Sequence, residues 1–246
     1  MEGTIMTTPM TTDPDAAMTG ITALVKLLHL VSPCLPTGGF AYSQGLEWAV
    51  EAAWIKDGKS LELWLQEVLE KAMACVDIPL FSRLHDAVCT QNIKAFTSWS
   101  SMVLACRETR ELRQEEKDRG RAMAVILQNL DMERPGPAGS DDWFGVVSTC
   151  QLAGFALAAA GWKIPVREGA AGYLWAWLEN QVLAGVKIIP LGQTEGQQIL
   201  QRLSSRIRDA VDKGMAMNDD DIGSSLPSLA IGSSCHEIQY TRLFRS

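Results

Sequence analysis

Apolar side chains recur at the helical period of 3.6 residues along most of this 246-residue chain. The clearest stripe consists of Leu61, Trp64, Leu65, Val68, Leu69 and Ala72, with Ser60 in position to cap the start of the helix. No segment shows a convincing strand period; residues 186–191 fit a short strand or a buried connection between helices. The sequence therefore predicts an all-α fold, a single compact bundle of about eight to ten helices without a significant sheet.

Composition changes divide the chain into three parts. Residues 1–20 are rich in Thr, Met and Asp, contain two prolines, and are predicted to be a disordered leader. Residues 21–222 are predicted to form the helical domain, with helices over about 92–130, 167–185 and 192–213 and a break at 135–139. Residues 223–246 are predicted to form a C-terminal helix, opening near Pro227, and a tail.

Residues 143–162 carry no charge and are long enough to span a bilayer. Their hydrophobicity comes largely from alanine, and polar residues and glycines interrupt them, so a buried helix hairpin is the better interpretation. Residues 1–20 contain no Lys or Arg and no apolar core of a secretory signal. The six cysteines show no C-x-x-C spacing. We therefore expect a cytoplasmic protein with reduced thiols and no membrane association.

The net charge of −7 argues against nucleic acid as the main partner, because phosphate backbones require clustered Lys and Arg. Charge is concentrated in residues 107–121, where eleven of fifteen residues are ionisable. Pairs at i, i+4 (Arg107 with Glu111, Glu115 with Arg119) would support an exposed helix. Most of this run is predicted to be a solvated face that could also steer a specific partner.

A proline–glycine block at residues 32–47 has the sequence SPCLPTGGFAYSQGLE. Pro33 and Pro36 restrict the backbone, and Gly38 and Gly39 allow a sharp turn before an amphipathic helix that begins near Leu46. A glycine turn before a helix could hold an anion, but the phosphate-binding signatures G-x-x-x-x-G-K-[ST] and G-x-G-x-x-G are absent. The block is predicted to be a structural turn that launches the first long helix.

Metal and catalytic signatures are sparse. The three histidines are far apart in sequence, and neighbouring side chains around His236 diverge on a helix, so Cys34 and His236 are the only metal candidates and neither completes a site. There is no G-x-S-x-G motif and no local Cys–His signature. The residues therefore favour a protein without catalytic activity.

The tail, residues 236–246, is unusual for a terminal segment because Tyr240, Leu243 and Phe244 are interleaved with Arg242 and Arg245. If Leu243 and Phe244 stayed in water, each would lose about 1.5–3 kcal/mol of favourable burial free energy. Aromatic and Arg side chains are also common interface hot spots, so docking on a partner is favoured over packing within the chain.

Four segments identify the chain as resembling UreF-type urease accessory proteins over nearly its whole length after residue 20. They are SPCLPTGGFAYSQGLEWAVEAAWI (32–55), ACRETRELRQEEKDRGRA (105–122), AGVKIIPLGQTEGQ (184–197) and HEIQYTRLFRS (236–246). The first and last are highly specific to that family, and all four occur in family order and spacing.

The resemblance implies a helical, non-enzymatic scaffold in nickel delivery to apo-urease. Proteins of this type join a UreD/UreH-type accessory protein, and the pair recruits the UreG-type GTPase that carries nickel. They are typically homodimeric, hold no tight cofactor of their own, and form part of a channel proposed as the nickel route.

The same resemblance assigns residues. The segment Tyr240, Thr241, Arg242, Leu243, Phe244, Arg245 and Ser246 matches the part of the family that contacts the UreD/UreH-type partner. Lys187 matches a lysine that communicates with the GTPase. The leader is unmatched, and Cys34 stands where a small non-thiol residue is more usual, which leaves a contact with nickel open.

Two alternatives remain open. The first is a regulator of the partner GTPase, in a fidelity or GAP-like role that supplies a cation. The second is a small-molecule enzyme that uses the Gly38–Gly39 turn.

Overall fold

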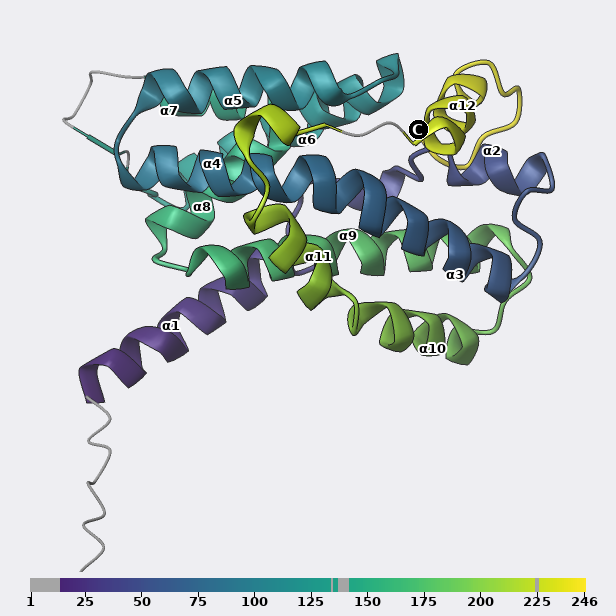
Figure 1. The fold of residues 1–246 in the computed structure, drawn as a ribbon, viewed down its shortest axis with the longest axis horizontal. Helices are drawn as coiled ribbons and strands as arrows, with labels where there is room; N and C mark the ends of the chain where they lie inside the picture. The colour runs from purple at the N-terminus through teal and green to yellow at the C-terminus, as the bar shows by residue number, and fades with distance from the viewer. Residues whose placement is uncertain (1–13, 134, 137–141, 224–225) are drawn as a thin grey trace, which may run out of the picture.

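The computed structural model describes residues 14–133, 135–136, 142–223 and 226–246, and these contain helices and turns but no strand (Figure 1). The predicted all-α fold is therefore confirmed. The α-helices are α1 (Pro14–Leu30), α2 (Leu46–Glu51), α3 (Gly58–Glu67), α4 (Ile78–Cys89), α5 (Ile93–Cys106), α6 (Arg110–Asn129), α7 (Trp143–Val147), α8 (Gln151–Gly161), α9 (Val166–Ile188), α10 (Gln193–Ser204), α11 (Ile207–Met215) and α12 (Pro227–His236).

The charge-free segment forms the centre of the bundle. It folds as α7, a turn at 148–150 and α8, and every residue of 151–159 is buried. Helix α8 packs against α4, α6 and α9, which small alanine side chains permit at close range. The prediction of buried helices is confirmed. Among the described helices, none is long and apolar enough to cross a membrane.

A continuous helical rod runs from α3 through a π-helix, Val68–Asp77, into α4. Asp57, rather than the predicted Ser60, is the N-cap, because Ser60 is the third helical residue and completes a capping box with it. Pro79 has no N–H to donate within the rod. The carbonyl of Cys75 instead accepts the backbone N–H of Gly223 at 3.2 Å, which ties the rod to the segment after α11.

Several predicted boundaries differ from the structure. The predicted helix over 92–130 is two helices separated at 107–109, and the one over 192–213 breaks after Ser204. Residues 186–188 are the last turn of α9. Helix α1 begins at Pro14, inside the predicted leader, since proline suits a first helical turn. The remainder of the leader, residues 1–13, lies outside the described residues.

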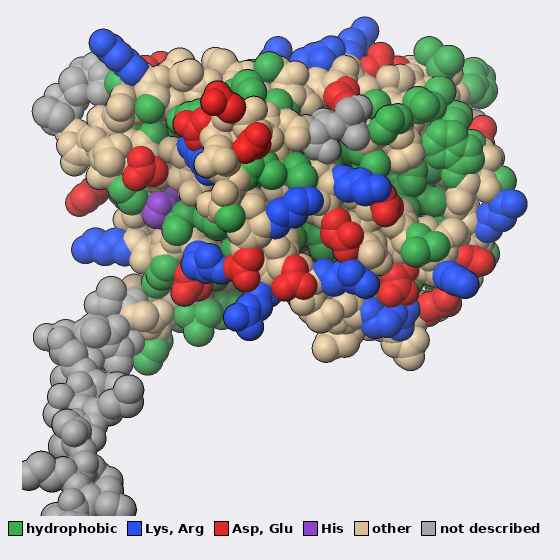
Figure 2. All heavy atoms as spheres, viewed as in Figure 1, with side chains coloured by type: hydrophobic (Ala, Val, Ile, Leu, Met, Phe, Trp, Pro, Cys, Tyr) green, Lys and Arg blue, Asp and Glu red, His purple; other side chains and the backbone are tan. Residues whose placement is uncertain are grey.

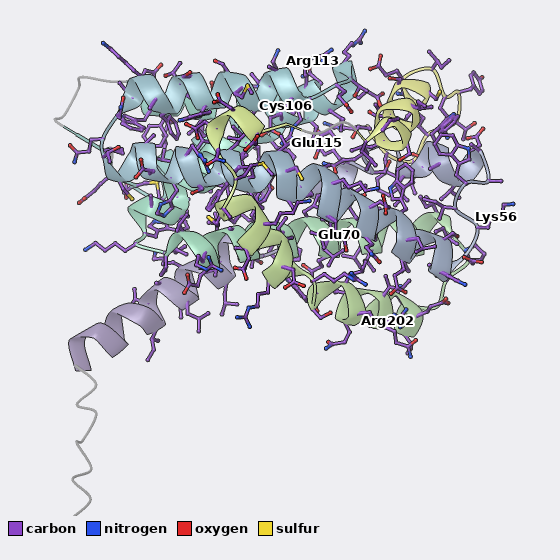
Figure 3. All side chains as sticks on the ribbon, viewed as in Figure 1. Lys56, Glu70, Cys106, Arg113, Glu115 and Arg202 are labelled. Atoms are coloured by element: carbon purple, nitrogen blue, oxygen red, sulfur yellow. The ribbon has the colours of Figure 1, made fainter. Side chains whose placement is uncertain are left out.

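Ion pairs fix the helices that cover the rod on one side. Arg202 of α10 pairs with Glu62 of α3 at 2.8 Å, and Arg206 pairs with Glu70 of the π-helix at 2.9 Å. Figure 3 labels Glu70 and Arg202 on this side of the molecule. Helix α1 projects away from the rest of the bundle and contacts mainly α8 and α9 (Figure 1).

The proline–glycine block forms a turn, as predicted, but does not launch a long helix. Gly38 has φ +74° and precedes a short 3-10 helix, Gly39–Ala41. Helix α2 has only six residues and ends before Ala53, whose φ is +57°. Gly45 is the most constrained position: its φ is +81°, and a Cβ there would lie 2.5 Å from the backbone nitrogen of Ser233. Glycine is therefore required where α2 meets α12.

Candidate partner-docking site

The backbone of the tail is held along residues 41–47. The N–H groups of Leu243 and Phe244 donate to the Glu47 carboxylate at 2.7 and 3.0 Å. Arg245 N–H donates to the Ala41 carbonyl at 2.8 Å, and the backbone oxygen of Ser246 accepts the N–H of Ser43 at 2.6 Å and that of Gln44 at 3.0 Å. The Ser43 hydroxyl donates to the same oxygen at 2.5 Å. The tail thus docks on the proline–glycine block.

A second carboxylate, Glu111 near the start of α6, holds the other side of the tail. Its Oε1 accepts from the Arg242 guanidinium at 2.9 Å. Its Oε2 lies 2.7 Å from Nδ1 of His236, whose Nε2 lies 3.2 Å from Oε2 of Glu47. His236 is fully buried between the two glutamates.

The tail side chains divide into buried and exposed sets. Phe244 and Ser246 are 6% and 1% exposed, whereas Ile238 and Leu243 are 86% and 64% exposed and Tyr240 is fully exposed. Figure 2 shows hydrophobic side chains gathered at this end of the molecule, where Figure 1 places α2 and α12. Intramolecular packing therefore accounts for Phe244, while the structure leaves Tyr240 and Leu243 available to another molecule.

Lys187 lies beside this tail. It is exposed in the last turn of α9, and its Nζ is 5.8 Å from the centroid of the Phe244 ring, within reach of a cation–π contact. The two sets of residues that the sequence resemblance singled out are thus adjacent in the fold.

Behind the block lies a cavity of about 160 Å³ whose lining combines apolar and charged side chains. Its walls are the proline–glycine block, the π-helix, α6, α8 and α9, with single residues from α1 and α12. Its ionisable lining includes Asp77, Arg107, Glu115, Glu116 and Arg119. The volume is enough for several water molecules, since one needs about 10–15 Å³ of such space.

The charged run therefore does more than form the predicted solvated face. Arg107 precedes α6, points inward, and donates to Asp77 at 2.6 and 3.1 Å and to Glu116 at 3.1 Å. The predicted pair with Glu111 is wrong, because Arg107 lies outside the helix. The Tyr173 hydroxyl donates to Asp77 at 3.2 Å. Burial lowers the pKa of Arg107, but Asp77 and Glu116 outweigh this and raise it overall.

The second predicted pair is confirmed: Arg119 Nη1 donates to Glu115 Oε1 at 2.8 Å. Burial raises the pKa of Glu115, although Arg119 and the Gln44 amide oppose the shift. Figure 3 labels Glu115 among the central helices. The lining also includes Glu179, so the four carboxylates and two guanidiniums of the cavity leave two negative charges in excess when all are ionised.

The two metal candidates do not come together in a ligand set. Cys34 is exposed in the block, while both ring nitrogens of His236 contact carboxylates. Over the described ranges, no three His, Cys, Asp or Glu side chains are placed to hold a metal ion. The residues that sequence reasoning missed are Glu47 and Glu111. Glu47 is the last residue of the proline–glycine block, but its position in the sequence alone does not indicate that it binds the tail.

Known proteins resemble the chain throughout this fold. The UreF family model matches residues 55–204. A urease accessory protein UreF from Alcanivorax borkumensis is 48% identical over 225 residues, covering 91% of this chain and 98% of the relative. Proteins of the same name from Pseudomonas putida and Klebsiella pneumoniae are 47% and 42% identical, with 91% and 90% of this chain and 98% and 97% of the relatives covered. The chain therefore belongs to the UreF family of urease accessory proteins.

Proposed function

We propose that this protein is a non-enzymatic cytoplasmic scaffold for urease maturation. It joins a UreD/UreH-type protein through the tail and recruits a UreG-type GTPase, and the assembly docks on apo-urease to deliver nickel. The names of its relatives support the urease role. The observation that carries the docking assignment is a tail whose backbone is anchored while Tyr240 and Leu243 face outward.

Exposed apolar groups on a fixed backbone suit partner binding because little conformational entropy remains to be lost. The aromatic ring of Tyr240 and the flanking Arg242 are of the residue types that dominate interface energies. Lys187, adjacent to Phe244, extends this surface toward α9 and is the proposed point of communication with the GTPase.

The charged groups of the cavity behind the block support a role in handling the cargo ion. Its excess negative charge favours a cation over an anion, and its volume admits water around an ion. We therefore place the protein's share of the nickel route along Asp77, Glu115 and Glu116, with no tight resident site.

Homodimer formation is part of the proposal. Helix α1 exposes Ile21, Leu24, Val25 and Leu28 by 54–61%, at i, i+3, i+4 and i+7. This stripe carries no charge, so two copies can approach along it without repulsion. Leu24→Glu should shift the protein toward monomer in light scattering, while Leu63→Glu, of similar exposure on α3, should not.

The docking assignment is tested by removing residues 243–246 and measuring pull-down by the UreD/UreH-type partner. Binding should be lost while the helical circular dichroism of the bundle is retained. Unchanged binding would contradict the assignment.

The second candidate function is regulation of the GTPase, favoured by the exposed cation of Lys187 at the tail. GTP turnover by the partner, measured with and without this protein, separates the two functions. A large acceleration of GTP turnover that Lys187→Ala abolishes would support regulation. Unchanged turnover would exclude regulation and retain only the scaffold function.

A further inference from the structure

His236 occupies an unusual place among the charged groups of the tail junction. Its ring is fully buried, with Nδ1 2.7 Å from Glu111 Oε2 and Nε2 3.2 Å from Glu47 Oε2. An ionised carboxylate can only accept hydrogen bonds, and a neutral imidazole has a single N–H. Both contacts can be hydrogen bonds only when the three groups together hold one proton more than a neutral ring and two carboxylates.

The same two carboxylates hold the tail. Glu47 accepts the backbone N–H groups of Leu243 and Phe244, and Glu111 accepts from Arg242. Loss of the extra proton leaves a ring lone pair facing a carboxylate oxygen in a dry site, where electrostatic repulsion is strong. The carboxylates must then move or take up water, and the tail backbone that depends on them is released.

Other charged groups meet at this junction from every element packed on it. Glu51 of α2 accepts from Gln239, and Glu237 accepts the N–H groups of Arg110 and Glu111 at the start of α6. The remaining ones are Glu115, which accepts from Ser246, Lys187 at the end of α9, Arg245 in the tail and the neighbouring thiol Cys235. None of these groups hydrogen-bonds to the ring. The number of protons shared at the ring therefore depends on His236, Glu47 and Glu111.

We propose that His236 is a positioning residue that clamps the tail in a proton-dependent manner. With the extra proton, the clamp is closed and presents Tyr240 and Leu243 on a fixed backbone. Without it, the tail loosens and the docking surface is lost. The effect on partner binding rests on the proposed function of the tail. The clamp itself does not, because it is a property of the isolated chain.

The test is hydrogen–deuterium exchange of the Leu243 and Phe244 amides in the full chain between pH 5.5 and 8.5, corrected for intrinsic exchange. Protection should fall by about tenfold or more as pH rises, the size expected for losing a hydrogen bond to a charged group. Constant protection of the unmodified chain would overturn the proposal.

Two variants sharpen the test. In Glu111→Gln, the amide can donate to a neutral ring while its oxygen accepts from Arg242, so the tail should stay protected without pH dependence. His236→Gln should expose the two amides at every pH. The control is His29→Gln, because His29 stacks on Trp162 at 6.0 Å, away from the tail, and its pH profile should match the unmodified chain. Full pH dependence in Glu111→Gln, or its loss in His29→Gln, would contradict the clamp.

Partner affinity, measured at the same pH values, separates this inference from the proposed function. A pH-dependent tail whose removal leaves affinity unchanged would retain the clamp and refute the docking role. A tail that is essential for binding but equally protected at all pH values would refute the clamp and retain the docking role.

Discussion

Replacing Arg107 by methionine should destabilise the fold more than any surface substitution. The guanidinium donates three hydrogen bonds to two carboxylates, and the side chains of Asp77 and Glu116 are only 2% and 7% exposed. Methionine preserves most of the volume but leaves both carboxylates without their cation. Breaking a buried pair in this way costs about 3–5 kcal/mol of unfolding free energy.

Urea denaturation followed by circular dichroism measures this loss directly. The matched control is Arg208→Met, because the side chain of Arg208 is 87% exposed and its ion pair with Asp212 is long, at 3.9 Å. The expected loss of unfolding free energy is under about 1 kcal/mol. Adding Asp77→Asn and Glu116→Gln to Arg107→Met should recover part of the stability, because no buried charge remains unpaired. An Arg107→Met protein within 1 kcal/mol of the unmodified chain would refute the reasoning.

Three further predictions follow from the same structure. Gly45→Ala should destabilise the α2–α12 contact by more than about 1 kcal/mol, because its φ is positive and its Cβ would meet Ser233; thermal unfolding measures it, and an unchanged midpoint would contradict the packing. Burial raises the pKa of Glu115, so at pH values just above the ordinary glutamate pKa the folded protein binds more protons than the unfolded chain. The free energy of unfolding therefore falls as pH rises through this range. Glu115→Gln should flatten that part of the stability–pH curve, and an identical slope would count against the shift. Lys187→Ala should reduce urease activation in a reconstituted assay while complex assembly, followed by gel filtration, is retained; normal activation would remove this lysine from the functional surface.

The helical period and turn residues predicted much of the fold. The stripe starting at Leu61 became the buried face of its helix, and the alanine-rich segment 151–159, which is largely apolar all round, became buried on every side. Boundaries were less predictable. The π-helix over 68–77 was not predicted, because its i→i+5 hydrogen bonds occur within an otherwise continuous helical rod.

The charged run shows why the candidate site was harder to predict. Glu115 and Glu116 have the sequence character of a solvated face, yet both are buried. Glu115 pairs with Arg119 one turn along α6 and accepts a hydrogen bond from Gln44, while Arg107 reaches Glu116 from outside the helix. The tail was predicted as an unusual apolar segment. Which of its side chains pack inward depends on Glu47, whose role follows only from the folded backbone.

The central claim is that the outward side chains of the tail bind the partner. The most direct measurement is the affinity of the UreD/UreH-type protein for the double variant Tyr240→Ser, Leu243→Ser, which keeps Phe244 and the backbone contacts. Loss of two hot-spot side chains should weaken binding by about 100-fold. Leu63→Ser, at 55% exposure on α3, should bind as the unmodified chain does. Equal affinity of the double variant and the unmodified chain would contradict the account.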